Sequence, residues 1–279
     1  MISSVTRQLI RLALEEDIAA GDLTSELAVD SDRHGVGYLK CKESAVICGL
    51  HIVAEIIKEA GASLRVKFTV VDGDKLVPGQ VFGEITGPLR ELLSLERTIL
   101  NFLQRLSGCA TLARKISEES GGLRICDTRK TTPGFRSLEK YAVRIGGAAN
   151  HRFDLGQMVL VKDNHIDAND GDVNKTLRKI FDSKPPYSPV EIEVRDMDEV
   201  KSAVEFPVTA IMLDNMSDTE IATAVKFIKK SRPECLIEVS GGMTPERLKR
   251  LSGLGADTVS MGMLTNKYIS VDISLDIKV

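Results

Sequence analysis

The residues best suited to chemistry in this chain of 279 residues are basic, and they are concentrated in its middle third. Between residues 97 and 165 there are twelve Lys and Arg but six Asp and Glu, although the whole chain carries a formal net charge of −3. Many of these basic residues stand beside Gly, Thr, Pro or Asn, so a solvated helix face explains only part of them. Arg presents a planar fork to carboxylates and phosphates, whereas Lys is a compact charge. The pattern predicts a pocket for anionic small molecules.

Beyond the first third of the chain there are six short apolar runs, and each of them contains or leads into polar residues or glycine. They are LRIC, MVLV, VEIEV, AIML, CLIEV and DTVSM, and helical patterns lie between several of them. Alternating strands and helices indicate parallel strands, and six such runs in about 140 residues favour an α/β barrel over an open sheet. Chemistry in such a barrel gathers at the carboxyl ends of the strands, which is where the polar residues stand here.

The last two apolar runs lead into glycine. Ser240, Gly241 and Gly242 follow the fifth run, and the sixth contains Ser260 and leads to Gly262. Glycine lets backbone N–H groups approach a phosphate closely, and the loops after the late strands of a barrel are a frequent phosphate site. We therefore predict a phosphate site at these positions, with plain turn glycines as the alternative.

The first third of the chain predicts a smaller α+β unit. Residues 3–14, 51–60 and 92–106 have helical patterns, the last of them ending at Gly108, and residues 36–48 alternate as a strand does. The sequence has no G-x-G-x-x-G after a strand and no Walker A pattern. A dinucleotide-binding fold and a P-loop are therefore disfavoured.

Composition disfavours several classes of protein. No apolar stretch approaches the length of a membrane span, and Arg7, Arg11 and Glu15 near the start do not fit a signal peptide. The five cysteines form no C-x-x-C pair, so reduced thiols in a cytoplasmic protein are expected. With 4% aromatic residues, no Trp and a net charge of −3, a nucleic-acid-binding module is disfavoured.

Four segments together carry a resemblance to one family of enzymes. They are residues 95–108 (LERTILNFLQRLSG), 127–143 (DTRKTTPGFRSLEKYAV), 146–152 (GGAANHR) and 158–165 (MVLVKDNH). These segments closely resemble the quinolinate phosphoribosyltransferase family, and the similarity extends over nearly the whole chain. The resemblance implies an N-terminal α/β sandwich domain over residues 1–108 and a seven-stranded α/β barrel over residues 109–266. A tail, residues 267–279, is expected to pack back onto the first domain.

The resemblance also implies the reaction. The family transfers a phosphoribosyl group from 5-phosphoribosyl 1-pyrophosphate to quinolinate with decarboxylation, which gives nicotinate mononucleotide, pyrophosphate and carbon dioxide in NAD biosynthesis. It is magnesium-dependent, and its working unit is a homodimer or higher homo-oligomer in which a partner subunit closes each active site. Both substrates are polyanions, which agrees with the basic middle third.

By matching positions, the resemblance assigns several basic residues to the substrates. Five of them are expected to line the quinolinate pocket: Arg129, Lys130, His151, Arg152 and Lys162. Lys130 and Lys162 are also expected to face pyrophosphate. Thr131 adds a hydroxyl contact, and Arg97 reaches across from the other subunit.

Two carboxylates at predicted strand ends, Glu193 and Asp214, are matched to the donor ribose and its magnesium ion. Mg²⁺ takes few carboxylates together with phosphate oxygens of a substrate, which suits two acids; helix capping or an internal ion pair is the alternative. Glu191 has the strand parity of Glu193 and is expected to point inward as well. The expected catalytic residues are Lys130, Lys162, Glu193 and Asp214. The expected ligands of the 5′-phosphate are Ser240, Gly241, Gly242, Ser260 and Gly262.

Two other functions remain alternatives. A related protein of molybdate-transport gene clusters shares DTRK-like segments and can differ in substrate, but TTPG after DTRK and the complete NHR favour the quinolinate enzyme. A Schiff-base lyase would use Lys162 at the end of a barrel strand. The family's Thr-His-Ser segment reads Thr265, Asn266 and Lys267 here, a departure close to the expected phosphate site. His165 is placed either near the site or in a structural role.

Overall fold

The computed structural model of the chain describes residues 2–278 and divides them between two compact units that alternate along the sequence. Unit 1 comprises Met1–Lys115, Lys130–Gly147 and Met263–Val279, and unit 2 comprises Ile116–Arg129 and Ala148–Gly262. The expected domain boundaries after residues 108 and 266 stay a prediction. Within residues 2–278, every helix is too short or too polar to cross a membrane.

Unit 1 is built on a four-stranded antiparallel sheet with the strand order β12-β1-β5-β3. Its strands are β1 (His34–Cys41), β3 (Arg65–Phe68), β5 (Val81–Pro88) and β12 (Ile273–Lys278), and β2 (Ala45–Val46) pairs separately with β4 (Lys75–Leu76). The register of β12 on β1 runs from Val36 opposite Lys278 to Cys41 opposite Ile273. The C-terminal segment of the chain is therefore an edge strand of this sheet.

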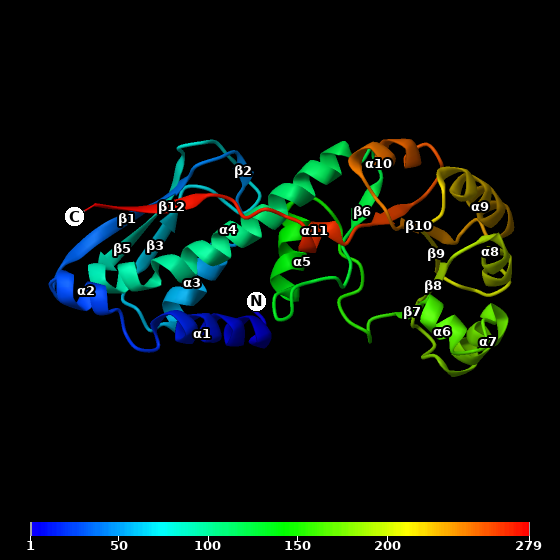
Figure 1. Ribbon diagram of the computed structural model, residues 1–279, viewed down its shortest axis with the longest axis horizontal. Helices are drawn as coiled ribbons and strands as arrows, with labels where there is room; N and C mark the ends of the chain where they lie inside the picture. Colours follow the sequence, from blue (N-terminus) through cyan, green and yellow to red (C-terminus); the bar gives the residue numbers. More distant parts are fainter. Residues whose placement is uncertain (1, 279) are drawn as a thin grey trace. The chain divides into compact units, whose positions relative to one another are not determined.

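Helices lie alongside this sheet, as Figure 1 shows for α3 and the first half of α4. The helices that lie in unit 1 or begin there are α1 (Ser4–Ile18), α2 (Leu23–Ala28), α3 (Leu50–Glu59), α4 (Leu89–Glu119), α5 (Arg136–Ile145) and α11 (Met263–Asn266). Ile52 and Ile56, four residues apart on α3, are fully buried, as are Phe82 and Ile85 of β5. This spacing gives α3 one apolar face, and burial of that face stabilises the unit.

The long helix α4 overturns the expectation that a helix ends at Gly108. Gly108 lies inside this helix, and a Cβ atom at this position would stand 2.2 Å from the carbonyl oxygen of Ile269. Glycine is therefore required here by the close approach of a distant backbone segment of the same unit, and not by a helix end.

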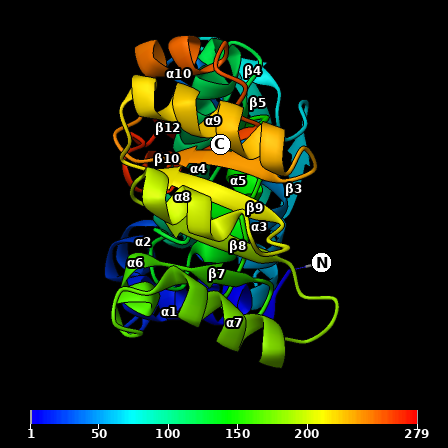
Figure 2. The same cartoon turned by 90° about the vertical axis from the view of Figure 1, so that its right-hand side faces the viewer.

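Unit 2 is an α/β unit with a parallel sheet of six strands in the order β6-β11-β10-β9-β8-β7. The strands are β6 (Arg124–Cys126), β7 (Val159–Val161), β8 (Val190–Val194), β9 (Ala210–Asp214), β10 (Leu236–Ser240) and β11 (Thr258–Ser260). The helices are α6 (Asp163–Asp167), α7 (Val173–Ser183), α8 (Met197–Ala203), α9 (Asp218–Ser231) and α10 (Pro245–Leu251). Figure 2 shows α7 to α10 on the outer face of the strands. Each strand coincides with one of the six apolar runs.

The number of strands in this sheet differs from the seven expected from the resemblance, since residues 2–278 supply six. Beside β6, a single parallel bridge between Cys126 and Ala149 takes the place of a further strand. The N–H of Ala149 donates to Ile125 O at 2.7 Å, and the N–H of Asp127 donates to Ala149 O at 3.0 Å. The ladder stops there because the next N–H, that of His151, donates to the side chain of Asp127 instead.

Candidate active site

The carboxyl ends of the parallel strands bring most of the predicted site residues of unit 2 to one edge of the sheet. Asp214 at the end of β9 lies in register with Ser240 at the end of β10. Lys162 follows β7 directly, and Ser260, which is 4% exposed, ends β11 immediately before Met261 and Gly262. Since neighbouring parallel strands end at the same edge, the acids, the lysine and the glycine turns share it, as expected for a site in an α/β barrel.

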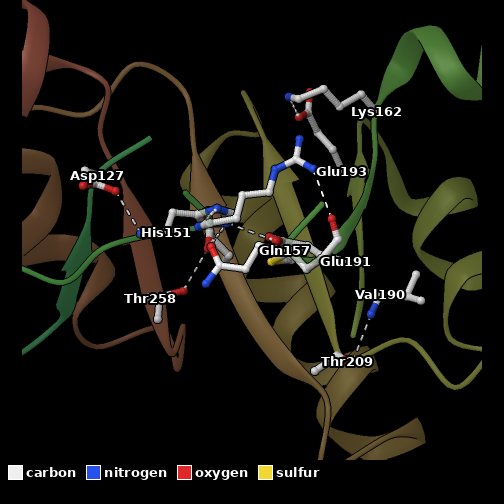
Figure 3. Close-up of polar contacts among 12 residues, drawn as sticks. Asp127, His151, Gln157, Lys162, Val190, Glu191, Glu193, Thr209 and Thr258 are labelled. Carbon is white, nitrogen blue, oxygen red and sulfur yellow. Dashed lines mark hydrogen bonds and ion pairs between the residues drawn. The ribbon is translucent and has the colours of Figure 1, made fainter. Parts of the chain in front are cut away.

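Lys162 and Glu193 form an ion pair at the ends of the adjacent strands β7 and β8 (Figure 3). Nζ of Lys162 donates to Oε2 of Glu193 at 2.6 Å, and the two side chains are 43% and 12% exposed. A pair with one partner this exposed contributes about 1 kcal/mol or less to stability. Glu193 therefore has the ion pair that was the alternative to a magnesium role. Nδ1 of His165 accepts the N–H of Lys162 at 2.9 Å at the start of α6, so this histidine lies beside a predicted site residue and makes a structural contact with it.

The turn after β10 has a backbone conformation that requires glycine. Gly241 and Gly242 have φ angles of +85° and +56°, and a Cβ atom at position 241 would stand 2.1 Å from Oδ1 of Asn215. The N–H of Asn215 donates to Ser240 O at 3.1 Å, and its Nδ2 donates to Oδ2 of Asp214 at 2.6 Å. The turn is thus fixed against the end of β9, with one carboxylate oxygen of Asp214 already engaged.

Arg152 is a buried arginine with a second arginine beside it. It is 7% exposed, and its Nη1 donates to Met158 O at 3.2 Å. Burial, and then the like charge of Arg129, lower the pKa of Arg152. Burying a guanidinium near a like charge is costly unless anions compensate it, and the charges of Glu191 and Asp154 act in the opposite sense by raising the pKa of Arg152. A buried arginine near a second arginine fits a pocket for a carboxylate or phosphate.

Three buried acids surround the segment that carries Arg152. Asp127, Glu191 and Glu238 are 0%, 2% and 6% exposed. Asp127 accepts Nδ2 of Asn150 at 2.6 Å and the N–H of His151 at 2.9 Å. Nε2 of His151 lies 3.0 Å from Oε2 of Glu191 and 3.5 Å from Oε2 of Glu238, and Figure 3 shows the ring directed toward β8. The segment is held both at its backbone and at its imidazole.

Glu238 was not among the predicted site residues. Burial, and then the charge of Glu191, raise its pKa to about 7, because two carboxylates this close in a buried place do not ionise together easily. A signal for it was present in the sequence, where a charged residue interrupts the apolar run CLIEV at the strand parity of Ser240. This parity points both side chains to the same face of the sheet.

Three predicted site residues belong to unit 1, namely Arg97, Lys130 and Thr131. Arg97 and Lys130 are exposed. The carbonyl oxygen of Lys130 accepts Oγ1 of Thr265 at 2.9 Å, and Oγ1 of Thr131 accepts Nε of Arg136 at 3.0 Å. The expected contacts of these three side chains with the substrates stay a prediction.

Known proteins resemble the chain over nearly its whole length. The family models "Quinolinate phosphoribosyl transferase, N-terminal domain" and "C-terminal domain" match residues 22–107 and 109–276. The probable nicotinate-nucleotide pyrophosphorylase [carboxylating] of Bacillus subtilis is 36% identical, covering 97% of this chain and 93% of the relative. A relative of the same name in Methanocaldococcus jannaschii is 35% identical and covers 99% of both chains. The crystal structure of NadC from Streptococcus pyogenes superimposes with a TM-score of 0.91 at 36% identity, over 97% of this chain and 95% of that one. The chain therefore belongs to the quinolinate phosphoribosyltransferase family.

Proposed function

We propose that the chain transfers the phosphoribosyl group of 5-phosphoribosyl 1-pyrophosphate to quinolinate, with loss of carbon dioxide, and so forms nicotinate mononucleotide for NAD biosynthesis. As a member of its family the chain is an enzyme, a pentosyltransferase. One observation carries the proposal of the site: Arg152, buried beside Arg129, lies in the same unit as the glycine turn after β10. Both substrates are polyanions, and the sheet edge offers cationic and N–H groups for them.

In the proposed reaction the pyridine nitrogen attacks the anomeric carbon as pyrophosphate leaves with the bonding electron pair. The transition state has oxocarbenium character, as in glycoside cleavage, and needs no covalent nucleophile. Positioning and electrostatic stabilisation therefore supply most of the rate. The ring nitrogen becomes cationic, which favours release of the adjacent carboxylate as carbon dioxide. A proton then takes its place on the ring carbon.

Individual groups have separate tasks in this proposal. Arg129 and Arg152 bind the two carboxylates of quinolinate, since a guanidinium fork matches a carboxylate. Lys130 and Lys162 neutralise the departing pyrophosphate, and Thr131 adds a hydroxyl contact. The 5′-phosphate is held by the residues of the two late turns: Ser240, Gly241, Gly242, Ser260 and Gly262.

Magnesium is the proposed cofactor, held by Glu193 and Asp214. Asp214 is the last residue of β9, and Glu193 is the residue before the last of the adjacent strand β8. An oxygen-only donor set of two acids fits Mg²⁺, which would complete its shell with water and substrate phosphate. The cluster of His151, Glu191 and Glu238 also brings three possible ligand atoms together, within 4.8 Å. It suits Mg²⁺ less well because it includes a nitrogen and is buried. Bound by Glu193 and Asp214, the ion would neutralise charge on the pyrophosphate.

The reaction itself is the first test. Incubation of the protein with quinolinate, the donor and Mg²⁺ is expected to give nicotinate mononucleotide and pyrophosphate in equal amounts, measured by chromatography. Chelation of the metal with EDTA should lower the rate about a hundredfold, since a metal supplies several kcal/mol of charge stabilisation. Nicotinate in place of quinolinate is the control and should give no product. Product from nicotinate, or from neither acid, would contradict the proposal.

The active site is further proposed to be shared in a homodimer, with Arg97 of one subunit completing the site of the other. Support comes from the exposure of Arg97 on α4 and from two leucines of α2, Leu23 and Leu27, which are 70% and 79% exposed. Large exposed apolar side chains close together are typical of a protein interface.

Co-expression of two inactive variants tests the shared site. Arg97→Ala and Arg152→Ala should each be nearly inactive, yet a co-expressed mixture should regain about a quarter of wild-type activity, because about half of the dimers are hybrids with one intact site. Light scattering should give twice the chain mass of 30.5 kDa. The same two variants mixed without exchange of subunits serve as the control. A hybrid preparation that stays inactive would argue against a shared site.

A cytoplasmic location is also proposed. Five free cysteines are buried in the described chain: Cys41, Cys48, Cys109, Cys126 and Cys235. Burial raises the pKa of the Cys126 thiol to about 12, so this thiol stays protonated and unreactive. Free thiols of this kind fit a reducing compartment.

A further inference from the structure

Both ring nitrogens of His151 are engaged within unit 2. The N–H of Arg152 donates to Nδ1 at 2.9 Å, while Nε2 faces Oε2 of Glu191 at 3.0 Å and Oε2 of Glu238 at 3.5 Å. A ring nitrogen that accepts an N–H carries no proton, and one that faces carboxylate oxygens must donate. The contacts therefore place the proton of His151 on Nε2, and the surroundings hold the ring in this tautomer.

The two glutamates occupy positions where an apolar side chain would be expected. They lie inside the strands β8 and β10, next in sequence to the fully buried Ile192 and Ile237, and they are 2% and 6% exposed. Among residues 2–278, Oε1 of Glu191 has no hydrogen-bond partner. Buried carboxylates with unmade hydrogen bonds are costly, and an apolar residue of similar size is often the more stable choice. A role in holding the imidazole accounts for their presence.

The orientation of the imidazole bears directly on Arg152. The backbone N–H of Arg152 donates to Nδ1 of His151, and the guanidinium of Arg152 donates to Met158 O at 3.2 Å. On the other side, Asp127 holds the side chain of Asn150 and the N–H of His151. If the ring turned or changed tautomer, the N–H of Arg152 would lose its acceptor. The backbone of Arg152 would then no longer be fixed by this hydrogen bond.

We infer that Glu238 is a positioning residue for the acceptor substrate: with Glu191 it fixes His151 in the Nε2–H tautomer and so sets the place of Arg152 in the quinolinate pocket. The inference rests on the proposed function. His151 then acts on quinolinate through Arg152, and its own ring nitrogens are reserved for contacts within the chain.

The first test separates the two substrates kinetically. Glu238→Ala should raise KM for quinolinate about tenfold or more and change KM for the phosphoribosyl donor less than about twofold, because a displaced Arg152 weakens the binding of only one substrate. Glu238→Gln should stay within about threefold of wild type for both, since its amide oxygen still accepts Nε2–H. The matched control is Glu199→Ala, which removes another buried acid of unit 2 that binds Arg195 at 2.6 Å, and both KM values should be unchanged.

Three kinetic outcomes would overturn the inference. They are an unchanged KM for quinolinate in Glu238→Ala, an equal rise of both KM values in that variant, and a Glu238→Gln enzyme as impaired as Glu238→Ala. A purely structural role would lower the amount of active protein and leave the ratio of the two KM values at its wild-type value.

The second test reads the tautomer without any substrate. In wild-type protein labelled with ¹⁵N-histidine, the ring of His151 should show one protonated nitrogen, Nε2, with its signals assigned by their absence in His151→Gln. Glu238→Gln should keep this pattern. A doubly protonated ring or a proton on Nδ1 in the wild type would overturn the inference even if the alanine variant failed to fold. A wild-type protein that made no product from quinolinate would instead contradict the proposed function and leave the tautomer measurement intact.

Discussion

Arg152→Ala is expected to lower kcat/KM for quinolinate roughly 10²- to 10³-fold, about 3 to 4 kcal/mol of transition-state stabilisation. The guanidinium is 7% exposed and lies beside Arg129, so its bond to a substrate carboxylate would form away from water, where a charge-assisted pair is strongest. The variant also leaves that carboxylate without its partner. Steady-state kinetics with quinolinate as the varied substrate measures the loss.

Two further variants distinguish this role from a general loss of charge. Arg152→Lys keeps the charge but loses the planar fork, so it should recover only part of the lost activity. Arg195→Ala removes an arginine that is 43% exposed and paired with Glu199, and it should remain near wild type. Burial lowers the pKa of Arg152, so its buried charge costs folding free energy, which offsets part of the packing that the alanine variant loses. Wild-type turnover in Arg152→Ala would refute the assignment of this pocket.

The sheet of unit 2 could be predicted from the sequence because buried parallel strands leave a continuous apolar signal. Leu213 of β9 and Ile237 of β10, for example, are fully buried within two of the six runs. Parallel strands covered on both faces select such runs, and their carboxyl ends fix where the polar residues gather. The edge with Lys162, Asp214 and Ser240 followed from these two rules alone.

What the sequence did not reveal depends on contacts between distant segments. Gly108 was interpreted as a helix end, whereas its lack of a side chain admits the backbone of Ile269. The expected seventh strand is reduced to one bridge at Ala149 because Asp127 takes the next N–H of that segment. Glu238 acquires its role only where β8 and β10 bring it close to the same imidazole nitrogen as Glu191. Local periodicity carries no information about such pairs.

Glu238→Gln is expected to stabilise the protein at high pH. The pKa of Glu238 is raised to about 7 in the folded chain, by burial and then by the charge of Glu191, whereas an unfolded chain has the ordinary value of about 4.3. The folded state therefore binds the proton more tightly than the unfolded state. The stabilisation that this proton provides is fully present below about pH 4.3 and is lost as the pH rises to about 7, a change of about 4 kcal/mol. A glutamine does not ionise and escapes this loss.

Urea unfolding of both proteins between pH 5 and pH 8 tests the pH dependence. Relative to Glu238→Gln, the wild type should lose up to about 3 kcal/mol of unfolding free energy over this range. Asp22→Asn is a control of opposite sign: hydrogen bonds from Ser25 lower the pKa of Asp22, so its contribution is lost only toward lower pH, and its difference from wild type should be constant from pH 5 to pH 8. Parallel curves for wild type and Glu238→Gln would contradict the buried acid pair. A widening gap would show that the chain keeps an ionisable residue where a neutral one is more stable, which is the behaviour expected when a position is selected for the site it supports and not for the fold.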